Sequence, residues 1–234
     1  RLYLPDGRVV PTCVLYTETL QGPRRPITHL RFPGSALGGG YPVLSDVQGT
    51  THVGTLGCLV SDGRSLFALT DAHVAGEPNS PVYTLVQGER ELIGSSHPKR
   101  ITKMAFERAY PGFPGRRTIA NLDVGLVRVE DAKRWTSQVY GIGQFGELAD
   151  INPETASIDL IGCPVVSYGA ASGRMEGEIV GLFYRYRSIG GVDYVADFLI
   201  GPRSAGGTKS RNGYAASLAA SGNSGAIWFL EQPQ

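Results

Sequence analysis

The sequence predicts an all-β fold. Glycine occurs 32 times and proline 15 times among 234 residues, and they separate short apolar runs rich in β-branched and aromatic side chains. Apolar residues with helical spacing are almost absent. Hydrophobic residues make up 41% of the chain and charged residues 18%, a balance that excludes a disordered polypeptide.

The expected strands follow one another with turn-forming residues between them. Residues 130–139 (EDAKRWTSQV) are the exception: they predict one or two helical turns, where a connection between two halves would run. The first fifty residues are rich in proline and glycine and predict an extended arm with one strand around residues 9–16. The apolar runs are RVVPTCVLYTE (8–18), THVGTLGCLV (51–60), SLFALTDAHV (65–74), PVYTLVQ (81–87), LDVGLVRV (122–129), ASIDLIGCPVVSYG (156–169), GEIVGLFYRYRS (177–188), VDYVADFLIG (192–201) and GAIWFL (225–230).

Charge and cysteine content limit what the chain binds. Lysine and arginine together number 22 and aspartate and glutamate 21, so no overall field favours nucleic acid or an anionic membrane. No apolar stretch is long enough to span a bilayer. Cys13, Cys58 and Cys163 are dispersed and odd in number, which predicts neither a disulfide framework nor a zinc site. We therefore expect no metal and a cytoplasmic, reducing location. GIGQFG at 141–146 lacks the following helix of a dinucleotide site, so no cofactor is expected either.

Two motifs place acid–base chemistry at strand ends. In SLFALTDAHVAG an apolar strand delivers His73 into a turn of small residues, where a general base is held rigidly yet meets substrate. In NLDVGLVRV, Asp123 opens an alternating strand, and such a carboxylate fixes the tautomer of an imidazole. Taken singly, His73 is equally explained as a strand-end histidine bonded to a backbone carbonyl, and Asp123 as a turn residue.

A third motif, SGNSG at 221–225, is typical of a nucleophile loop. A serine hydroxyl needs a base to remove its proton, and the oxyanion that forms needs nearby backbone N–H donors. Glycines on both sides of Asn223 and Ser224 allow the backbone to supply those donors, which we expect from Gly222 and Ser224. A flexible linker is the alternative, but the apolar run AIWFL that follows favours a strand.

LTDAHV, LDVGLV and GNSGA, in this order, resemble the three catalytic blocks of the trypsin-like, chymotrypsin-fold serine proteases, and YGAASGRMEGEIVGL resembles the early second barrel of bacterial members. The intervals are 50 residues from His73 to Asp123 and 101 from Asp123 to Ser224. The resemblance implies an arm (1–50), a first β-barrel with histidine and aspartate (51–145) and a second with serine (146–234). Each barrel would be antiparallel and of the six-stranded type.

The resemblance also implies roles and departures. Ser224 would be the nucleophile, His73 the base and Asp123 its orienting partner, and Leu218, six residues before the serine, would floor a pocket for apolar or small side chains. Asn223 replaces the aspartate that pairs with a new N-terminus in the digestive enzymes. Val74 replaces a disulfide-forming cysteine, and Ala226 replaces a glycine.

Few residues follow Ser224. GAIWFL supplies one strand, whereas the second barrel of this family needs about two more. We expect the N-terminal arm, or a downstream segment or partner domain, to complete it. The predicted function is a serine endopeptidase that acts on protein or peptide substrates. The alternatives are a catalytically idle protease-like domain that binds peptides or regulates, and a narrow esterase.

Overall fold

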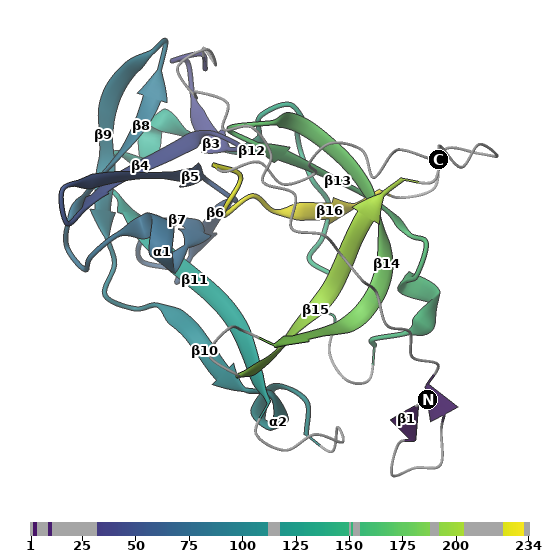
Figure 1. Ribbon diagram of the computed structural model, residues 1–234. Coiled ribbons are helices and arrows are strands. Elements are labelled where there is room, and N and C mark those ends of the chain that lie inside the picture. Colours follow the sequence, from purple (N-terminus) through teal and green to yellow (C-terminus); the bar gives the residue numbers. More distant parts are fainter. Residues whose placement is uncertain are drawn as a thin grey trace.

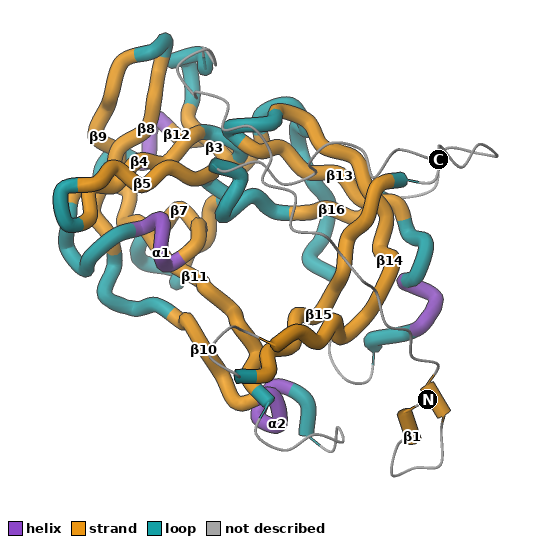
Figure 2. The backbone as a smooth tube through the Cα atoms, viewed as in Figure 1, coloured by secondary structure: helices purple, strands orange, loops and turns teal. Residues whose placement is uncertain are grey.

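The computed structural model describes residues 32–111, 118–149, 151, 155–187, 192–203 and 222–231, together with two short strands near the N-terminus (Figures 1 and 2). These residues are mostly strands, which confirms the predicted all-β class. Two short α-helices, α1 (Ala72–Ala75) and α2 (Phe106–Ala109), follow directly on strands. The strands are β1 (Leu2–Tyr3), β2 (Val9–Val10), β3 (Leu37–Gly39), β4 (Pro42–Val47), β5 (Thr50–Thr55), β6 (Leu59–Ser61), β7 (Leu66–Asp71), β8 (Pro81–Val86), β9 (Glu89–Ser96), β10 (Ile101–Ala105), β11 (Ile119–Val129), β12 (Trp135–Val139), β13 (Pro164–Gly169), β14 (Gly173–Arg187), β15 (Asp193–Pro202) and β16 (Trp228–Leu230).

The first half of the molecule closes on itself. β4 pairs with β5 and β8, β8 with β9, β9 with β11, β11 with β7, and β7 with β6. β5 and β6 follow each other with a break at residues 56–58, and across this break Gly57 donates its backbone N–H to Leu69 of β7. The pairings therefore run from β5 through β4, β8, β9, β11 and β7 to β6, and the chain itself links β6 back to β5. We call this set of strands the first barrel.

The interior of this barrel is filled by aliphatic side chains that alternate along the strands with more exposed ones. Gly94 (φ +154°) lies so close to the backbone of Arg128 that an added side chain would overlap it, which is how β9 packs against β11. The barrel and its ends are filled by one cluster of buried residues, which includes Phe32, Leu37, Tyr41, Val43, Leu56, Ala68, Val74, Val82, Val86, Ile93 and Val127.

The second half consists of β13 to β16, in the order β16-β13-β14-β15. Figure 1 shows β14 and β15 curving along one side of the molecule, with the yellow β16 between the two halves. β15 joins the first half through a short parallel pairing with β11, in which Ile119 faces Tyr194. The two halves are thus one hydrogen-bonded sheet system, and β16 follows directly on the loop that carries Ser224.

Several details differ from the prediction. The expected helical segment at 130–139 forms one 3-10 turn, Ala132–Arg134, and then β12, which pairs in parallel with β3. Apolar periodicity gave no sign of β9 or β10, since these strands have few apolar residues, and Leu92 and Ile101 among them are exposed. α1 was also not predicted, because four residues at the end of a strand are too few to show a helical period.

The N-terminal arm is described only in part. β2 covers the start of the predicted strand at 9–16 and pairs with β1, and these two form a sheet of their own. Cys58 and Cys163 have free thiols, whereas Cys13 lies outside the described residues. In the described part of the chain no helix has the length and apolar character needed to cross a bilayer.

Candidate active site

His73 is carried by α1, the single helical turn that follows β7. The other side chains of this turn, Ala72, Val74 and Ala75, are buried and fix it against the barrel. Gly125 of β11 permits this close approach, because a side chain there would lie 2.8 Å from the Cα of Ala72. The side chain of His73 remains 51% exposed, so its ring lies at the protein surface.

Asp123 reaches His73 because β11 is irregular at this point. Two residues of β11, Leu122 and Asp123, lie opposite one residue of β10, Thr102, which forms a β-bulge. Asp123 has φ +43°, a left-handed conformation that is uncommon outside glycine, although aspartate adopts it more readily than most residues. The bulge and this backbone turn direct the carboxylate of Asp123 toward α1.

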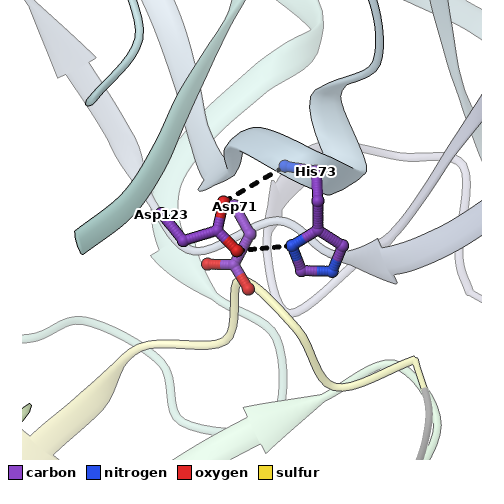
Figure 3. Close-up of side chains that lie close together, drawn as sticks. All are labelled: Asp71, His73 and Asp123. Atoms are coloured by element: carbon purple, nitrogen blue, oxygen red, sulfur yellow. Dashed lines mark hydrogen bonds and ion pairs between the residues drawn. The ribbon is translucent and has the colours of Figure 1, made fainter. Parts of the chain in front are cut away.

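The two side chains form a short hydrogen bond, 2.6 Å between Nδ1 of His73 and Oδ2 of Asp123 (Figure 3). The other oxygen, Oδ1, accepts the backbone N–H of His73 at 3.2 Å. Since an ionised carboxylate has no proton to give, Nδ1 carries the hydrogen and donates it. The remaining ring nitrogen, Nε2, is then the basic one, which is the tautomer a general base needs.

Ser224 lies in a tight turn between the two halves. The N–H of Ala226 donates to the carbonyl of Asn223, and glycines with positive φ, Gly222 (+104°) and Gly225 (+93°), flank the turn. Both residues expected as oxyanion donors, Gly222 and Ser224, are therefore on this loop. Within the described residues no hydrogen bond joins the Ser224 hydroxyl to the ring of His73. The structure thus brings His73 and Asp123 into contact and places Ser224 on an adjacent loop.

Thr55, at the end of β5, ties this loop to the first barrel. Its side chain is fully buried, and its hydroxyl donates to the carbonyl of Gly222 at 2.8 Å. Its backbone N–H donates to the carbonyl of Ser224 at 2.7 Å. The same hydroxyl accepts the N–H of Ala170, from the second half, at 2.9 Å. Thr55 was not singled out in the sequence, because a threonine at a strand end carries no signal of such a contact.

Asn223 ties the loop to the second half. Its Oδ1 accepts the backbone N–H groups of Ala171 and Ser172 at 3.2 and 3.1 Å. Its Nδ2 donates to the hydroxyl of Ser172 at 2.8 Å and toward the sulfur of Met175 at 3.4 Å. The asparagine that replaces the expected aspartate therefore holds the loop through neutral hydrogen bonds.

Asp71 is a second carboxylate at the site, directly before α1. The nearest ligand-type atoms of Asp71, His73 and Asp123 lie within 4.8 Å of one another. Burial, and then the charge of Asp123, raise the pKa of Asp71 to about 6. The hydrogen bond to His73 already uses one oxygen of Asp123 and one ring nitrogen, so we do not assign these residues as metal ligands. The motif LTDAHV contains Asp71. The proximity of Asp71 to Asp123 depends on the bulge in β11, however, and the sequence gives no sign of that bulge.

Comparison with known proteins adds a homologue. A protein of Bradyrhizobium tropiciagri named a probable serine protease is 42% identical over 233 residues, which is 98% of this chain. The resemblance to the serine proteases is confirmed. The chain spans 28% of the length of that homologue.

Solved structures of bacterial serine proteases are more distant. Thermobifida fusca protease A is 20% identical, with a TM-score of 0.45 over 83% of this chain and 77% of that one. Nocardiopsis protease is 16% identical, with a TM-score of 0.45 over 82% of this chain and 77% of that one. No protein-family model matches the chain. Leu218, the residue predicted to floor the substrate pocket, lies outside the described residues.

Proposed function

We propose that the chain is a serine endopeptidase in which Ser224, His73 and Asp123 act as one catalytic unit. The observation that carries the proposal is the 2.6 Å hydrogen bond between Nδ1 of His73 and Oδ2 of Asp123. It leaves Nε2 as the basic nitrogen of a half-exposed ring, beside a loop whose serine lies between two glycines. The 42% identical homologue named a probable serine protease supports the same activity.

The proposed reaction proceeds by acyl transfer. The Ser224 oxygen forms a bond to the peptide carbonyl carbon while its proton passes to Nε2 of His73. The N–H groups of Gly222 and Ser224 donate to the resulting oxyanion. The carbon–nitrogen bond then breaks, and His73 returns the proton to the leaving amine. A water molecule, deprotonated by His73, releases the acyl group and restores Ser224. Asp123 orients the ring and stabilises its positive charge.

A catalytically idle, peptide-binding domain is the second candidate. It is favoured by the missing hydrogen bond between Ser224 and His73 among the described residues. Against it, catalytic hydrogen bonds are often long in ligand-free proteins and shorten when substrate binds.

Labelling with a fluorophosphonate probe decides it, because the probe reacts with a serine only when base and oxyanion donors are assembled. We expect the wild-type chain to be labelled at Ser224 and Ser224→Ala not at all. Ser61→Ala, which removes an exposed hydroxyl in β6, is the matched control and should label normally. An unlabelled but folded wild-type protein would favour the idle domain. Hydrolysis of esters but not of peptides would identify the esterase.

A further inference from the structure

Asp71 occupies the position of a helix cap but does not act as one. An aspartate directly before a helix normally accepts an N–H of the first turn. Asp71 makes no such bond to α1. Instead, Oδ1 of Asp123, from β11, accepts the N–H of His73 in that first turn. The carboxylate of Asp71 is thereby free for another contact.

That contact is with the nucleophile loop. The backbone N–H of Gly225, the residue directly after Ser224, faces the carboxylate of Asp71 and acts to lower its pKa. The close approach requires glycine, because an added side chain at residue 225 would overlap the carbonyl oxygen of Thr55 and the hydroxyl of Thr70, and would lie 3.2 Å from the backbone nitrogen of Asp71. Figure 3 shows the carboxylates of Asp71 and Asp123 side by side, with the yellow C-terminal segment next to Asp71. β7, β11, α1 and the Ser224 loop therefore meet at one carboxyl group.

Keeping Asp71 charged here is unfavourable for the fold. Burial and the carboxylate of Asp123 raise the pKa of Asp71 to about 6, while His73 and the N–H of Gly225 act in the opposite direction. Among the described residues, the titratable groups that act on it are Asp123 on β11 and His73 on α1. β5 and the Ser224 loop contribute the neutral groups of Thr55 and Gly225. Because the pKa is higher in the folded than in the unfolded chain, ionisation of Asp71 above pH 6 lowers stability, and below about pH 4 this loss is absent.

We propose that Asp71 is a positioning residue of the active site: its ionised carboxylate holds the backbone after Ser224 against the His73–Asp123 pair. The inference rests on the proposed function. It explains why a carboxyl group that disfavours the fold stands where a neutral cap would suffice, as strained groups do at functional sites.

The charge also acts on the reaction. When His73 takes the proton of Ser224, the ionised carboxylate of Asp71 stabilises the positive charge of the imidazolium in addition to that of Asp123. A protonated Asp71 loses this effect and accepts the N–H of Gly225 less strongly. Its hydroxyl also becomes a donor that competes with His73 for Asp123. Activity therefore requires an ionised Asp71 in addition to an unprotonated His73.

Two substitutions separate the contact from the charge. The amide oxygen of Asp71→Asn still accepts the N–H of Gly225 but has no charge, whereas Asp71→Ala loses both. We expect Asp71→Asn to lower kcat about ten-fold, the equivalent of one pKa unit, with little change in KM, and Asp71→Ala to lower it further. As the pH is lowered, kcat/KM should fall with the uptake of two protons in the wild type and of one proton in Asp71→Asn. Asp46→Asn, an exposed aspartate of β4 bonded to Thr51 and Arg90, is the control with an unchanged profile.

Urea unfolding adds a measurement that needs no turnover. Asp71→Asn should be more stable than the wild type at pH 7 and lose that advantage at pH 4, which a purely structural aspartate would not do. Wild-type kcat and an unchanged acid limb in Asp71→Asn would overturn the role of Asp71 while leaving the proposed function intact. A folded wild-type chain that neither labels nor hydrolyses peptides would overturn both.

Discussion

Replacing Thr55 by valine tests whether the nucleophile loop is held by the first barrel. Valine has nearly the shape of threonine but no hydroxyl, so two buried backbone groups lose their partner: the carbonyl of Gly222 and the N–H of Ala170. A buried polar group left without a partner costs about 1–3 kcal/mol, so the expected loss of unfolding free energy is roughly 2–6 kcal/mol. This is a large part of the roughly 5–15 kcal/mol that stabilises an ordinary domain.

The matched control is Thr84→Val. Thr84 is also fully buried, but its hydroxyl donates to one group, the carbonyl of Pro42, inside the first barrel and away from the Ser224 loop. We expect a loss of about 1–3 kcal/mol for this variant and an unchanged rate of fluorophosphonate labelling. Thr55→Val should lose about twice as much and label at least ten-fold more slowly, because Gly222 is displaced.

Urea unfolding at pH 7 measures the stabilities, and the time course of labelling measures the site. Should Thr55→Val fail to fold, Thr55→Ser retains the hydroxyl and should label at nearly the wild-type rate. The reasoning is refuted if Thr55→Val is no less stable than Thr84→Val, or if it is labelled as fast as the wild type.

Three further outcomes are expected. Gly225→Ala should abolish labelling, because its methyl group would overlap the carbonyl oxygen of Thr55. Gly63 has a similar φ but open space around it, so Gly63→Ala should label normally. Equal labelling of the two variants would contradict the assigned contact. Dithiothreitol should change neither kcat nor Tm, since the described cysteines are free thiols; a large drop would reveal a cystine. Profiling on a peptide library should show a preference for apolar or small side chains, and a sharp preference for arginine would exclude Leu218 as the pocket floor.

Several strands, and the positions of His73 and Asp123 at element ends, could be predicted because their signals are local. Apolar alternation gave β7, β8 and β11, and the three blocks around His73, Asp123 and Ser224 lie at element ends where short motifs are visible. The resemblance then placed the blocks in one site, and the hydrogen bond between His73 and Asp123 agrees with that placement.

What could not be predicted depends on contacts between distant segments. The bond from Thr55 to Gly222 spans 167 residues, and nothing near either residue indicates it. The bulge that turns Asp123 toward α1 depends on how β10 pairs with β11, and β10 has no apolar periodicity. Asp71 therefore had no visible partner in the sequence, although its motif was recognised. The helical expectation at 130–139 was wrong over β12, where pairing with β3 decides the structure.

Peptide turnover by single and double variants tests most directly whether Ser224, His73 and Asp123 form one catalytic unit. We expect Ser224→Ala and His73→Ala each to lower kcat about 10⁴-fold or more, and the double variant to be no slower than either one, because residues that act together are lost together. Near wild-type turnover by folded Ser224→Ala, or losses that multiply in the double variant, would contradict it.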